Sequence, residues 1–457
     1  MKSSLFMASV ALVAGVSVLV AQKNSVAVQP RADALPAPGS ASPKPSRPVT
    51  RADGLLPSVP SGFTVASYAE IQAPRLMVYA PNGDLFVSSP GTSSITVLRD
   101  ANNDGVFEAR SVFAKGEPPT PVPAPVPAGA GREGARGNAP PGGRGAPSTL
   151  GANAPPCAPP PPFAERGPGV LEAPFGMAFH DGYLYVGNPG SIIRYKYSPG
   201  DLTAQGAPEK LLDLPRGGHS TRNILFNRAG TKMYIAVGSR SNNDAGEDCR
   251  RAAILEFNPD GSGYRIYASG IRNPVGLALQ PGTDIVWTAM NERDNYGDDL
   301  VPDYATSVKD GGFYGWPYSY IGKNYDPRYI GSFPDLVNRS IVPDVLIPSH
   351  SAALGIAFYT GSQFPTRYRN GAFVALHGSW NRSAASGYKV IFFPMTGGKP
   401  GPIEDFLTGF LASNGVDGSP IEQWGRPVGV TVARDGGLLI SDDAGNRIWK
   451  VSASPAR

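Results

Sequence analysis

A hairpin pattern that recurs six times along the chain is the feature that most constrains its fold. Each copy consists of a short apolar strand, a turn containing Gly, Asn or Asp, and a second apolar strand. The copies begin at Leu76, Gly176, Asn223, Gly276, Gly355 and Gly429. A third apolar strand often follows, as in residues 191–197 and 447–451. Repeats of about 50 residues, each a small antiparallel sheet without a helical period, predict a propeller.

The predicted fold class is therefore all-β, a six-bladed β-propeller. A strand near residues 63–68 is placed to complete the last blade and close the ring. The main alternative, an all-β sandwich, does not explain why one hairpin pattern recurs six times. The spacing of the first two copies matches that of the others only when residues 117–168 are left out. We therefore expect one propeller domain over residues 61–457 with an insertion inside it.

Two low-complexity segments accompany the repeats. Residues 22–60 are rich in Pro, Ala and Ser, which predicts a disordered leader. Residues 117–168 are almost wholly Pro, Gly and Ala with scattered Arg and have no apolar periodicity. Such a segment buries too little surface to offset the entropy lost on ordering, so we expect the insertion to be disordered.

The first 21 residues indicate the location of the protein. Lys2 precedes an apolar, charge-free run over residues 5–21, which is the organisation of a secretory signal peptide. The alternative is a transmembrane anchor, for which this run is short compared with a span of roughly 20 residues. We expect an exported protein, periplasmic or secreted, that is membrane-bound only if this segment is not cleaved.

Composition excludes several classes of protein. Charged residues make up 17% of the chain and the net charge is +4, so the dense basic face of a nucleic-acid-binding protein is not expected. Cys157 and Cys249 are the only cysteines. They exclude a Cys-rich zinc site and a CxxCH haem attachment, and they leave a single disulfide open.

The repeat also gathers polar residues at one place. In a propeller the first strand of each blade lines the central channel, so the residues just before these strands surround one mouth of the channel. Counting back four positions in each repeat gives Gln72, Glu172, His219, Arg272, Ser351 and Gly425, with Asn273, His350 and Arg426 one position away. Because Arg binds carboxylates bidentately, the two guanidinium groups of this cluster suit an anionic, planar ligand.

His219 is the candidate general base of the predicted cluster. A neutral imidazole accepts a proton near neutral pH. The alternative is a structural histidine bonded to a loop carbonyl. His180 follows an inner strand and is typical of a turn, whereas His377 is either a neighbour of the site or a loop residue.

Two acidic segments allow a calcium interpretation. Residues 100–105 have oxygen donors at alternate positions and Gly105 at the sixth, like the start of an EF-hand loop. Ser111 stands where such a loop needs Glu, so a tight hairpin turn is the alternative. Residues 291–299 follow the second strand of the fourth repeat and are dense in oxygen donors, which fits either an ion site beside Arg272 or a solvated loop.

These residues together resemble a known family, the soluble quinoprotein glucose and sorbosone dehydrogenases. Members are six-bladed propellers that use pyrroloquinoline quinone (PQQ) with calcium. The resemblance covers residues 54–451 apart from the insertion, and the pattern is more similar to the sorbosone branch. It rests on residues 219–223, 270–276, 291–299, 313–317 and 377–382.

The resemblance implies a role for each matching position. His219 is similar to the family's base, which takes the hydroxyl proton as hydride leaves the sugar carbon for the quinone. Arg272 is similar to the arginine that polarises the quinone carbonyl and stabilises the developing oxyanion. Asn273 is similar to a neighbouring cofactor contact. Arg426 matches an arginine that binds a cofactor carboxylate, and Arg382 falls near a cationic cofactor ligand.

The resemblance also implies the metal, the substrate and the partners. Asp294 and Asn295 match residues whose backbone carbonyls hold the calcium ion. The implied substrate is an aldose, sorbosone or a related sugar or aldehyde, oxidised to its lactone or acid. The electrons pass to an acceptor that the sequence does not identify, and the redox chemistry belongs to the cofactor.

The chain departs from the glucose-oxidising pattern at three places. Gly218 replaces the acidic residue before the base, Glu172 lies near a position where glutamine is expected, and Asp294–Asn295 replaces Gly-Pro. Two other functions stay open, namely a calcium-dependent lactonase-type hydrolase and a non-catalytic binding module. The arginines favour an anionic cofactor over the hydrolase, and the departures at 172 and 218 favour the binding module.

Overall fold

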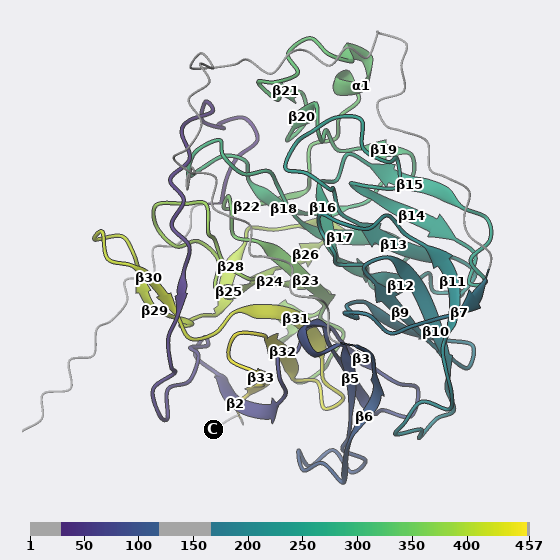
Figure 1. The fold of residues 1–457 in the computed structure, drawn as a ribbon. Coiled ribbons are helices and arrows are strands. Elements are labelled where there is room, and N and C mark those ends of the chain that lie inside the picture. The colour runs from purple at the N-terminus through teal and green to yellow at the C-terminus, as the bar shows by residue number, and fades with distance from the viewer. Residues whose placement is uncertain (1–28, 118–165, 455–457) are drawn as a thin grey trace, which may run out of the picture.

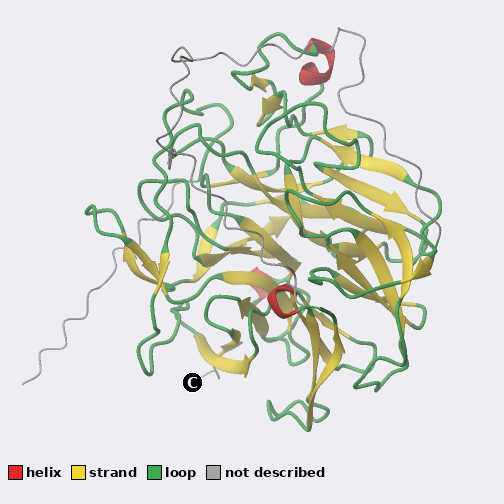
Figure 2. Cartoon of the chain, viewed as in Figure 1, coloured by secondary structure: helices red, strands yellow, loops and turns green. Residues whose placement is uncertain are grey.

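The structure is a computed structural model that describes residues 29–117 and 166–454. Strands and loops make up nearly all of the described chain (Figure 2). Its helices are α1 (Pro334–Asn338) and two short 3-10 turns, Pro90–Thr92 and Thr366–Tyr368. The all-β fold class predicted from the sequence is therefore confirmed.

The described strands form six sheets of four or five strands each (Figure 1). The first contains β3 (Met77–Tyr79), β4 (Leu85–Ser89), β5 (Ser94–Arg99) and β6 (Ala109–Lys115). The second contains β8 (Met177–His180), β9 (Tyr183–Asn188), β10 (Ser191–Lys196), β11 (Glu209–Asp213) and β7 (Gly167–Pro168). The third contains β12 (Ile224–Phe226), β13 (Met233–Val237), β14 (Ala253–Phe257), β15 (Arg265–Ser269) and β19 (Gly312–Phe313).

The remaining three large sheets have four strands each. The fourth contains β16 (Asn273–Leu279), β17 (Val286–Asn291), β18 (Asp303–Ser307) and β22 (Val345–Ile347). The fifth contains β23 (Ala353–Phe358), β24 (Ala372–Leu376), β25 (Lys389–Phe393) and β28 (Glu404–Leu407). The sixth contains β31 (Pro427–Val432), β32 (Leu438–Asp442), β33 (Arg447–Ala453) and β2 (Phe63–Glu70).

Each predicted hairpin is the first antiparallel pair of one sheet. β2, from near the start of the described chain, pairs with β33 near its end, as the strand near residues 63–68 was predicted to do. Smaller sheets join β1 (Arg47–Pro48), β29 (Leu411–Asn414) and β30 (Ile421–Gln423), β20 (Ser319–Tyr320) with β21 (Asn324–Tyr325), and β26 (Met395–Thr396) with β27 (Lys399–Pro400).

The first strands of the six large sheets lie side by side in chain order. β3 contacts β8, and the contacts continue through β12, β16, β23 and β31, which contacts β3 again. The repeat glycines make this approach possible. A Cβ at Gly176, Gly276, Gly355 or Gly429 would lie 2.3–2.5 Å from a backbone carbonyl oxygen of the neighbouring first strand or its lead-in segment. Only a residue without a side chain fits there.

A small apolar cluster fills the space where these first strands converge. Val275, Leu354 and Val428 lie in β16, β23 and β31, Phe175 lies two residues before β8, and all four are buried. Arg272, Asn273 and Arg426 lie two or three residues before members of this cluster. The cluster therefore forms an apolar floor beneath the polar residues that precede the first strands.

The predicted disordered leader differs from the structure where it is described, over residues 29–60. β1 pairs with β30, Gly39 N donates to Tyr296 O at 2.9 Å, and Lys44 N donates to Trp380 O at 2.8 Å. In Figure 1 this purple segment runs down beside the yellow β29–β30 hairpin. Its backbone groups are thus satisfied by loops distant in sequence, which its composition could not reveal.

Other predictions fall largely outside the described residues. The predicted signal peptide lies there, as does the insertion except Glu117 and residues 166–168, of which Gly167–Pro168 form the edge strand β7. Cys249 is disulfide-bonded, and the only other cysteine in the sequence is Cys157, which lies outside the described residues. Within the described ranges, no helix has the length and apolar character needed to cross a membrane.

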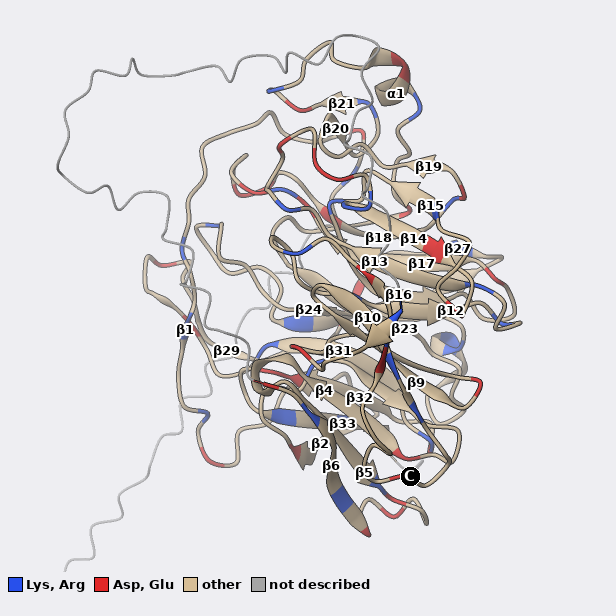
Figure 3. Cartoon of the chain, turned by 45° about the vertical axis from the view of Figure 1, so that its right-hand side comes forward, with Lys and Arg blue, Asp and Glu red and all other residues tan. Residues whose placement is uncertain are grey.

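Acidic and basic positions are interspersed over the sheets and loops rather than separated by sign (Figure 3). This arrangement agrees with the small net charge of +4.

Candidate active site

The candidate site lies where the first strands begin and the second strands end. His219, Arg272 and Arg426 precede β12, β16 and β31, and residues 291–299 begin at the last residue of β17. Residues 100–105, the other candidate calcium loop, connect β5 to β6, where Gly105 N donates to Asp100 and Asp104 N to Asn102. These contacts support the turn interpretation of residues 100–105.

His219 has a defined orientation. Its Nδ1 lies 2.9 Å from Ser239 O, directly after the third-sheet hairpin, and 3.2 Å from Ser239 Oγ. The Ser239 hydroxyl donates to Ser241 O at 2.6 Å. Because a carbonyl oxygen only accepts, Nδ1 carries the proton and Nε2 keeps a free lone pair. Burial, followed by the charge of Arg272, lowers the pKa of His219 to about 3, so the ring is neutral near neutral pH.

Gly218 explains the missing acidic partner of His219. Its φ is +63°, and a Cβ on it would lie 2.3 Å from Arg240 Cα and 2.7 Å from Ser239 O. A side chain therefore does not fit at position 218. The carbonyl of Ser239 takes over the orientation of the imidazole, which sequence reasoning could not detect because a backbone oxygen carries no residue signature.

Arg272 lies beside the acidic loop, as predicted. Its Nε donates to Asn242 O at 3.0 Å, its Nη2 to Asn242 Oδ1 at 3.0 Å and its Nη1 to Glu292 O at 2.7 Å. Asp294 Oδ2 lies 3.4 Å from Nη2. The guanidinium is thus fixed by protein acceptors, and it is buried. Sequence reasoning missed Asn242, which belongs to a loop outside the repeat register.

Asp294 has two basic neighbours, Arg272 and His350. Its carboxylate is 3.3 Å from His350 Nδ1 as well as near Arg272. Although burial raises the pKa of Asp294, the hydrogen bond from His350 and the charge of Arg272 hold it below its usual value. His350 Nε2 faces Gly297 O at 2.9 Å. Both ring nitrogens of His350 thus face acceptors. Although burial lowers the pKa of His350, the Asp294 carboxylate and the Gly297 carbonyl raise it above its ordinary value.

The contacts of Asp294 bear on the calcium prediction. The Asp294 carboxylate is committed to Arg272 and His350, and its carbonyl accepts from Asn242 Nδ2 at 3.0 Å. Among residues 29–117 and 166–454, no three His, Cys, Asp or Glu side chains are grouped as metal ligands. These contacts do not fit a metal held by the Asp294 side chain. The assignment of calcium to the carbonyls of Asp294 and Asn295 stays a prediction.

Arg426 lies in a second polar cluster at the same end of the strands. It donates to His377 O at 3.0 Å and Gly378 O at 3.1 Å. His377 Nε2 is 2.9 Å from Asp443, which also pairs with Arg75 at 2.6 Å. Burial, followed by the charge of Arg426, lowers the pKa of His377 to about 4.

This cluster identifies His377 as a site neighbour rather than an isolated loop residue. Sequence reasoning missed Arg75 and Asp443. The signal was present, because Arg75 directly precedes the first repeat and Asp443 directly follows the second strand of the last one.

The two other predicted cofactor residues have different surroundings. Arg382 pairs with Asp299 at 2.9 Å and donates to Asp298 O, so the acidic loop holds it. Asn273 Nδ2 donates to Asn291 Oδ1 at 2.6 Å. Asn273 Oδ1 is buried and has no hydrogen-bond partner within the described residues. Such an orphaned acceptor at the mouth fits a donor group on a bound ligand.

Glu172 forms a bidentate pair with Arg216, at 2.7 and 2.8 Å. The hydrogen bonds from Arg216, which outweigh partial burial, lower the pKa of Glu172. Its negative charge is therefore matched by a neighbouring cation.

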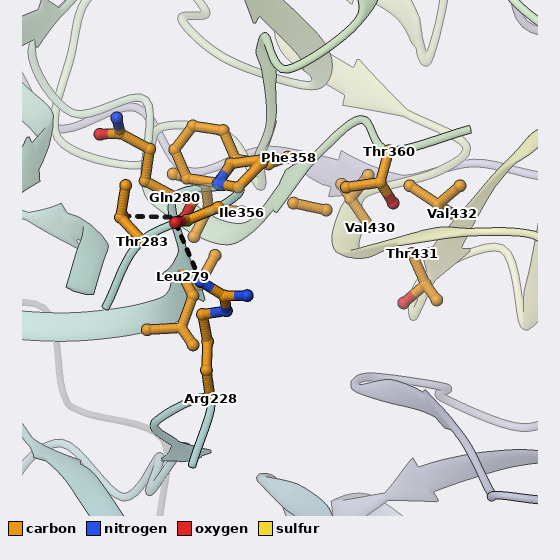
Figure 4. A pocket seen from close by; sticks show the side chains of 14 residues that line it. Arg228, Leu279, Gln280, Thr283, Ile356, Phe358, Thr360, Val430, Thr431 and Val432 are labelled. Carbon is orange, nitrogen blue, oxygen red and sulfur yellow. Dashed lines mark hydrogen bonds between the residues drawn. The ribbon is translucent and has the colours of Figure 1, made fainter. Parts of the chain in front are cut away.

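Two cavities lie at opposite ends of the first strands. One, of about 630 Å³, adjoins the loop that carries His219 and is lined by Pro215, Arg216, Arg240, Ser241, Asp244, Ala245, Gly246, Glu247, Asp248 and Arg251. The other, of about 380 Å³, lies at the far ends of β16, β23 and β31 (Figure 4). Its lining is mainly apolar, and Arg228 is its only charged residue, so it offers no group for acid-base chemistry.

Comparison with known proteins agrees with this geometry. The family model described as glucose/sorbosone dehydrogenase matches residues 209–379, which include His219, Arg272 and the acidic loop. A second model, described as TrAA12-like, matches residues 336–454. This chain belongs to the glucose/sorbosone dehydrogenase family.

The chain covers different shares of the length of its individual relatives. The chain is 30% identical over 299 residues to an uncharacterized protein of Borreliella burgdorferi, covering 62% of this chain and 76% of that one. It is 26% identical to a PQQ-dependent pyranose dehydrogenase of Coprinopsis cinerea, covering 60% of this chain but only 45% of the relative.

Solved structures share the fold. The calcium structure of a Trichoderma reesei carbohydrate-active enzyme of family AA12 has a TM-score of 0.64 at 16% identity, covering 87% of this chain and 97% of that one. The holo form of the Coprinopsis cinerea pyranose dehydrogenase PQQ domain has a TM-score of 0.63 at 20% identity, covering 89% and 100%.

Proposed function

We propose that this protein is a PQQ-dependent dehydrogenase that oxidises an aldose, sorbosone or a related sugar or aldehyde to its lactone or acid. The observation that carries the proposal is His219, a neutral imidazole with its Nε2 lone pair free, fixed by Ser239 O next to the buried cation Arg272. A base and a positive charge at one mouth are what removal of a hydroxyl proton and stabilisation of a developing oxyanion require.

The residues present fit an anionic quinone. The mouth has the guanidinium groups of Arg75, Arg272 and Arg426, against the carboxylates of Asp294 and Asp443. Arg426 would face a cofactor carboxylate, and the orphaned Oδ1 of Asn273 would accept from a cofactor donor. When bound, the quinone would supply the hydride acceptor.

The chain's own residues supply proton transfer and charge. His219 Nε2 takes the proton of the substrate hydroxyl, while Ser239 O accepts from Nδ1–H and steadies the imidazolium that forms. Arg272, held by Asn242 and Glu292, keeps a fixed positive charge near the reacting centre without reorganisation during the reaction.

Several finer statements belong to the same proposal. We propose that the six sheets are the blades of a closed propeller, supported by the contact of β31 with β3 and by the pairing of β2 with β33. Calcium as a second cofactor, export to the periplasm or medium, and a separate electron acceptor are also proposed. The resemblance of residues 219–223 and 377–382 supports the cofactors, and residues 1–21 support export.

Reconstitution tests the proposed function. Purified apoprotein is mixed with PQQ, with and without Ca²⁺, and assayed by absorbance and by dye reduction with an aldose panel and sorbosone. We expect a spectral change on binding and sugar-dependent turnover, and we expect His219→Ala to bind PQQ but not turn over. Absence of both a spectral change and turnover would contradict the dehydrogenase, and near-normal rates in His219→Ala would remove the base from its role.

A further inference from the structure

Arg222 is a fully buried guanidinium directly behind the base loop. Its exposed fraction is 0%, and it stands two residues before β12. Nη1 donates to His219 O at 2.7 Å and to Thr221 O at 2.8 Å, and Nη2 donates to Pro215 O at 2.7 Å. One side chain thus binds three carbonyl oxygens of residues 215–221, the segment that carries His219.

The electrostatics of Arg222 are unusual. Burial, followed by the charge of Arg251, lowers its pKa to about 9, and no carboxylate of the described residues counteracts this. A buried charge without a counterion destabilises a fold unless it is well hydrogen-bonded. An apolar side chain of similar volume would pack here equally well. Packing alone therefore does not explain why this position carries a guanidinium.

The backbone of Arg222 is as firmly placed as its side chain. Gly176 N donates to Arg222 O at 2.9 Å, and Asn223 Nδ2 donates to Val275 O at 2.9 Å in the next sheet. A Cβ at Gly187 would lie 2.3 Å from Arg222 O. The backbone at Arg222 and Asn223 is therefore fixed between the second and fourth sheets. The Arg222 side chain connects this fixed backbone to the loop that carries His219.

We propose that Arg222 is a positioning residue for the base: by binding the carbonyls of Pro215, His219 and Thr221 it holds the loop so that His219 reaches Ser239 O and the mouth. The inference rests on the proposed function, in which His219 is the base. It gives the arginine of the His219–Asn223 motif a role that is distinct from contact with cofactor or substrate.

Charge gives the proposal a second, independent readout. The charged groups that face the His219 ring are Arg272 before β16, Asp294 after β17 and Arg222 itself. Arg222 lowers the pKa of His219, and loss of its charge is expected to raise it. Arg222→Lys keeps the charge but cannot span three carbonyls, whereas Arg222→Met loses both.

The experiment compares wild type, Arg222→Lys and Arg222→Met, with Arg194→Met as the matched control. Arg194 is a half-buried arginine on β10, paired with Glu209 at 2.8 Å and away from the mouth. In both Arg222 variants we expect kcat to fall by about 100-fold, the loss typical of a misplaced catalytic group, with KM and the PQQ dissociation constant within threefold of wild type. The apparent pKa of the acid limb of the kcat–pH profile rises in Arg222→Met only.

Hydrogen exchange of the apoprotein separates this proposal from the proposed function. Amides of residues 215–223 should exchange faster in both Arg222 variants, while those of β24 stay protected and Arg194→Met leaves residues 215–223 unchanged. If wild type fails to turn over sugar but the exchange result holds, the proposed dehydrogenase function is wrong and the role of Arg222 in holding residues 215–221 stands. The positioning role of Arg222 is overturned if exchange at residues 215–223 is unchanged in the Arg222 variants. It is also overturned if their kcat loss is no larger than that of Arg194→Met.

Discussion

The neutral state of His219 predicts a specific dependence of stability on pH. The folded pKa of about 3 lies below the ordinary value of 6.5. Between these values the unfolded chain binds a proton that the folded chain does not. The contribution of His219 is therefore fully present above pH 6.5 and is lost as the pH falls toward 3. Substitution by Asn, whose amide can donate to Ser239 O, removes this titration.

The magnitude follows from the size of the shift. At pH 4.5, two units below the unfolded value, a fully shielded group would cost about 2.7 kcal/mol at 1.36 kcal/mol per unit. The imidazole stays partly open to the mouth, so we expect about 2 kcal/mol after screening by solvent. Between pH 8 and pH 4.5, wild type should lose about 2 kcal/mol more free energy of unfolding than His219→Asn.

Two measurements check this prediction. Urea unfolding at both pH values gives the difference between the losses of the two proteins. NMR of ¹⁵N-labelled histidine gives the protonation state directly, because the chain has only four histidines and His219→Asn assigns the signal. The reasoning is refuted if both proteins lose the same free energy, or if the His219 ring titrates near pH 6.5 or is protonated at Nε2 in its neutral form.

Three further predictions concern neighbours of the site. Gly238→Ala would place a Cβ 2.3 Å from Asn273 Oδ1 and 2.6 Å from His219 Cβ. We expect the free energy of unfolding in urea to fall by about 1–3 kcal/mol and kcat to fall at least tenfold. The control is Gly167→Ala, where the added Cβ meets nothing within 4 Å, and equal stability and kcat in the two variants would contradict the prediction. Asn242→Ala removes the Oδ1 acceptor of Arg272 and the Nδ2 donor to Asp294 O; we expect a Tm drop equivalent to about 1–3 kcal/mol and weaker PQQ binding by absorbance titration, and an unchanged PQQ affinity would separate Arg272 from the cofactor. Removal of residues 22–46 should speed hydrogen exchange at residues 294–299 and 379–386, because Gly39 and Lys44 bind those loops; unchanged exchange would show that the leader does not order them.

Residue pattern predicted most of the fold because the repeat is a local signal. Alternating apolar positions and turn residues define each hairpin, and the glycine that heads four of the copies marks the close approach of neighbouring first strands. The pairing of β2 with β33 was predictable because only one unassigned strand preceded the first repeat. The leader at residues 29–60 was not, since its contacts involve loops hundreds of positions away.

Only those site residues that hold equivalent positions in the repeats were predicted. His219, Arg272 and Arg426 precede first strands, and counting within the repeat brought them together. Their partners come from other places. Ser239 acts through a backbone oxygen and Asn242 lies in an irregular loop, so neither carries a signal in the pattern. Arg75 and Asp443 do occupy repeat-related positions, and extending the count to the ends of the second strands would have included Asp443.

The state of the carboxylates argues against the hydrolase alternative. A calcium-dependent lactonase needs acidic oxygens that converge on the ion and are free to bind it. At this mouth Asp294 is held by Arg272 and His350, and Asp443 by Arg75 and His377. Arg426 forms no side-chain ion pair within the described residues and donates to the backbone carbonyls of His377 and Gly378. A ligand that brings its own carboxylates completes this charge pattern, and for this reason the mouth favours an anionic cofactor over a metal ion bound alone.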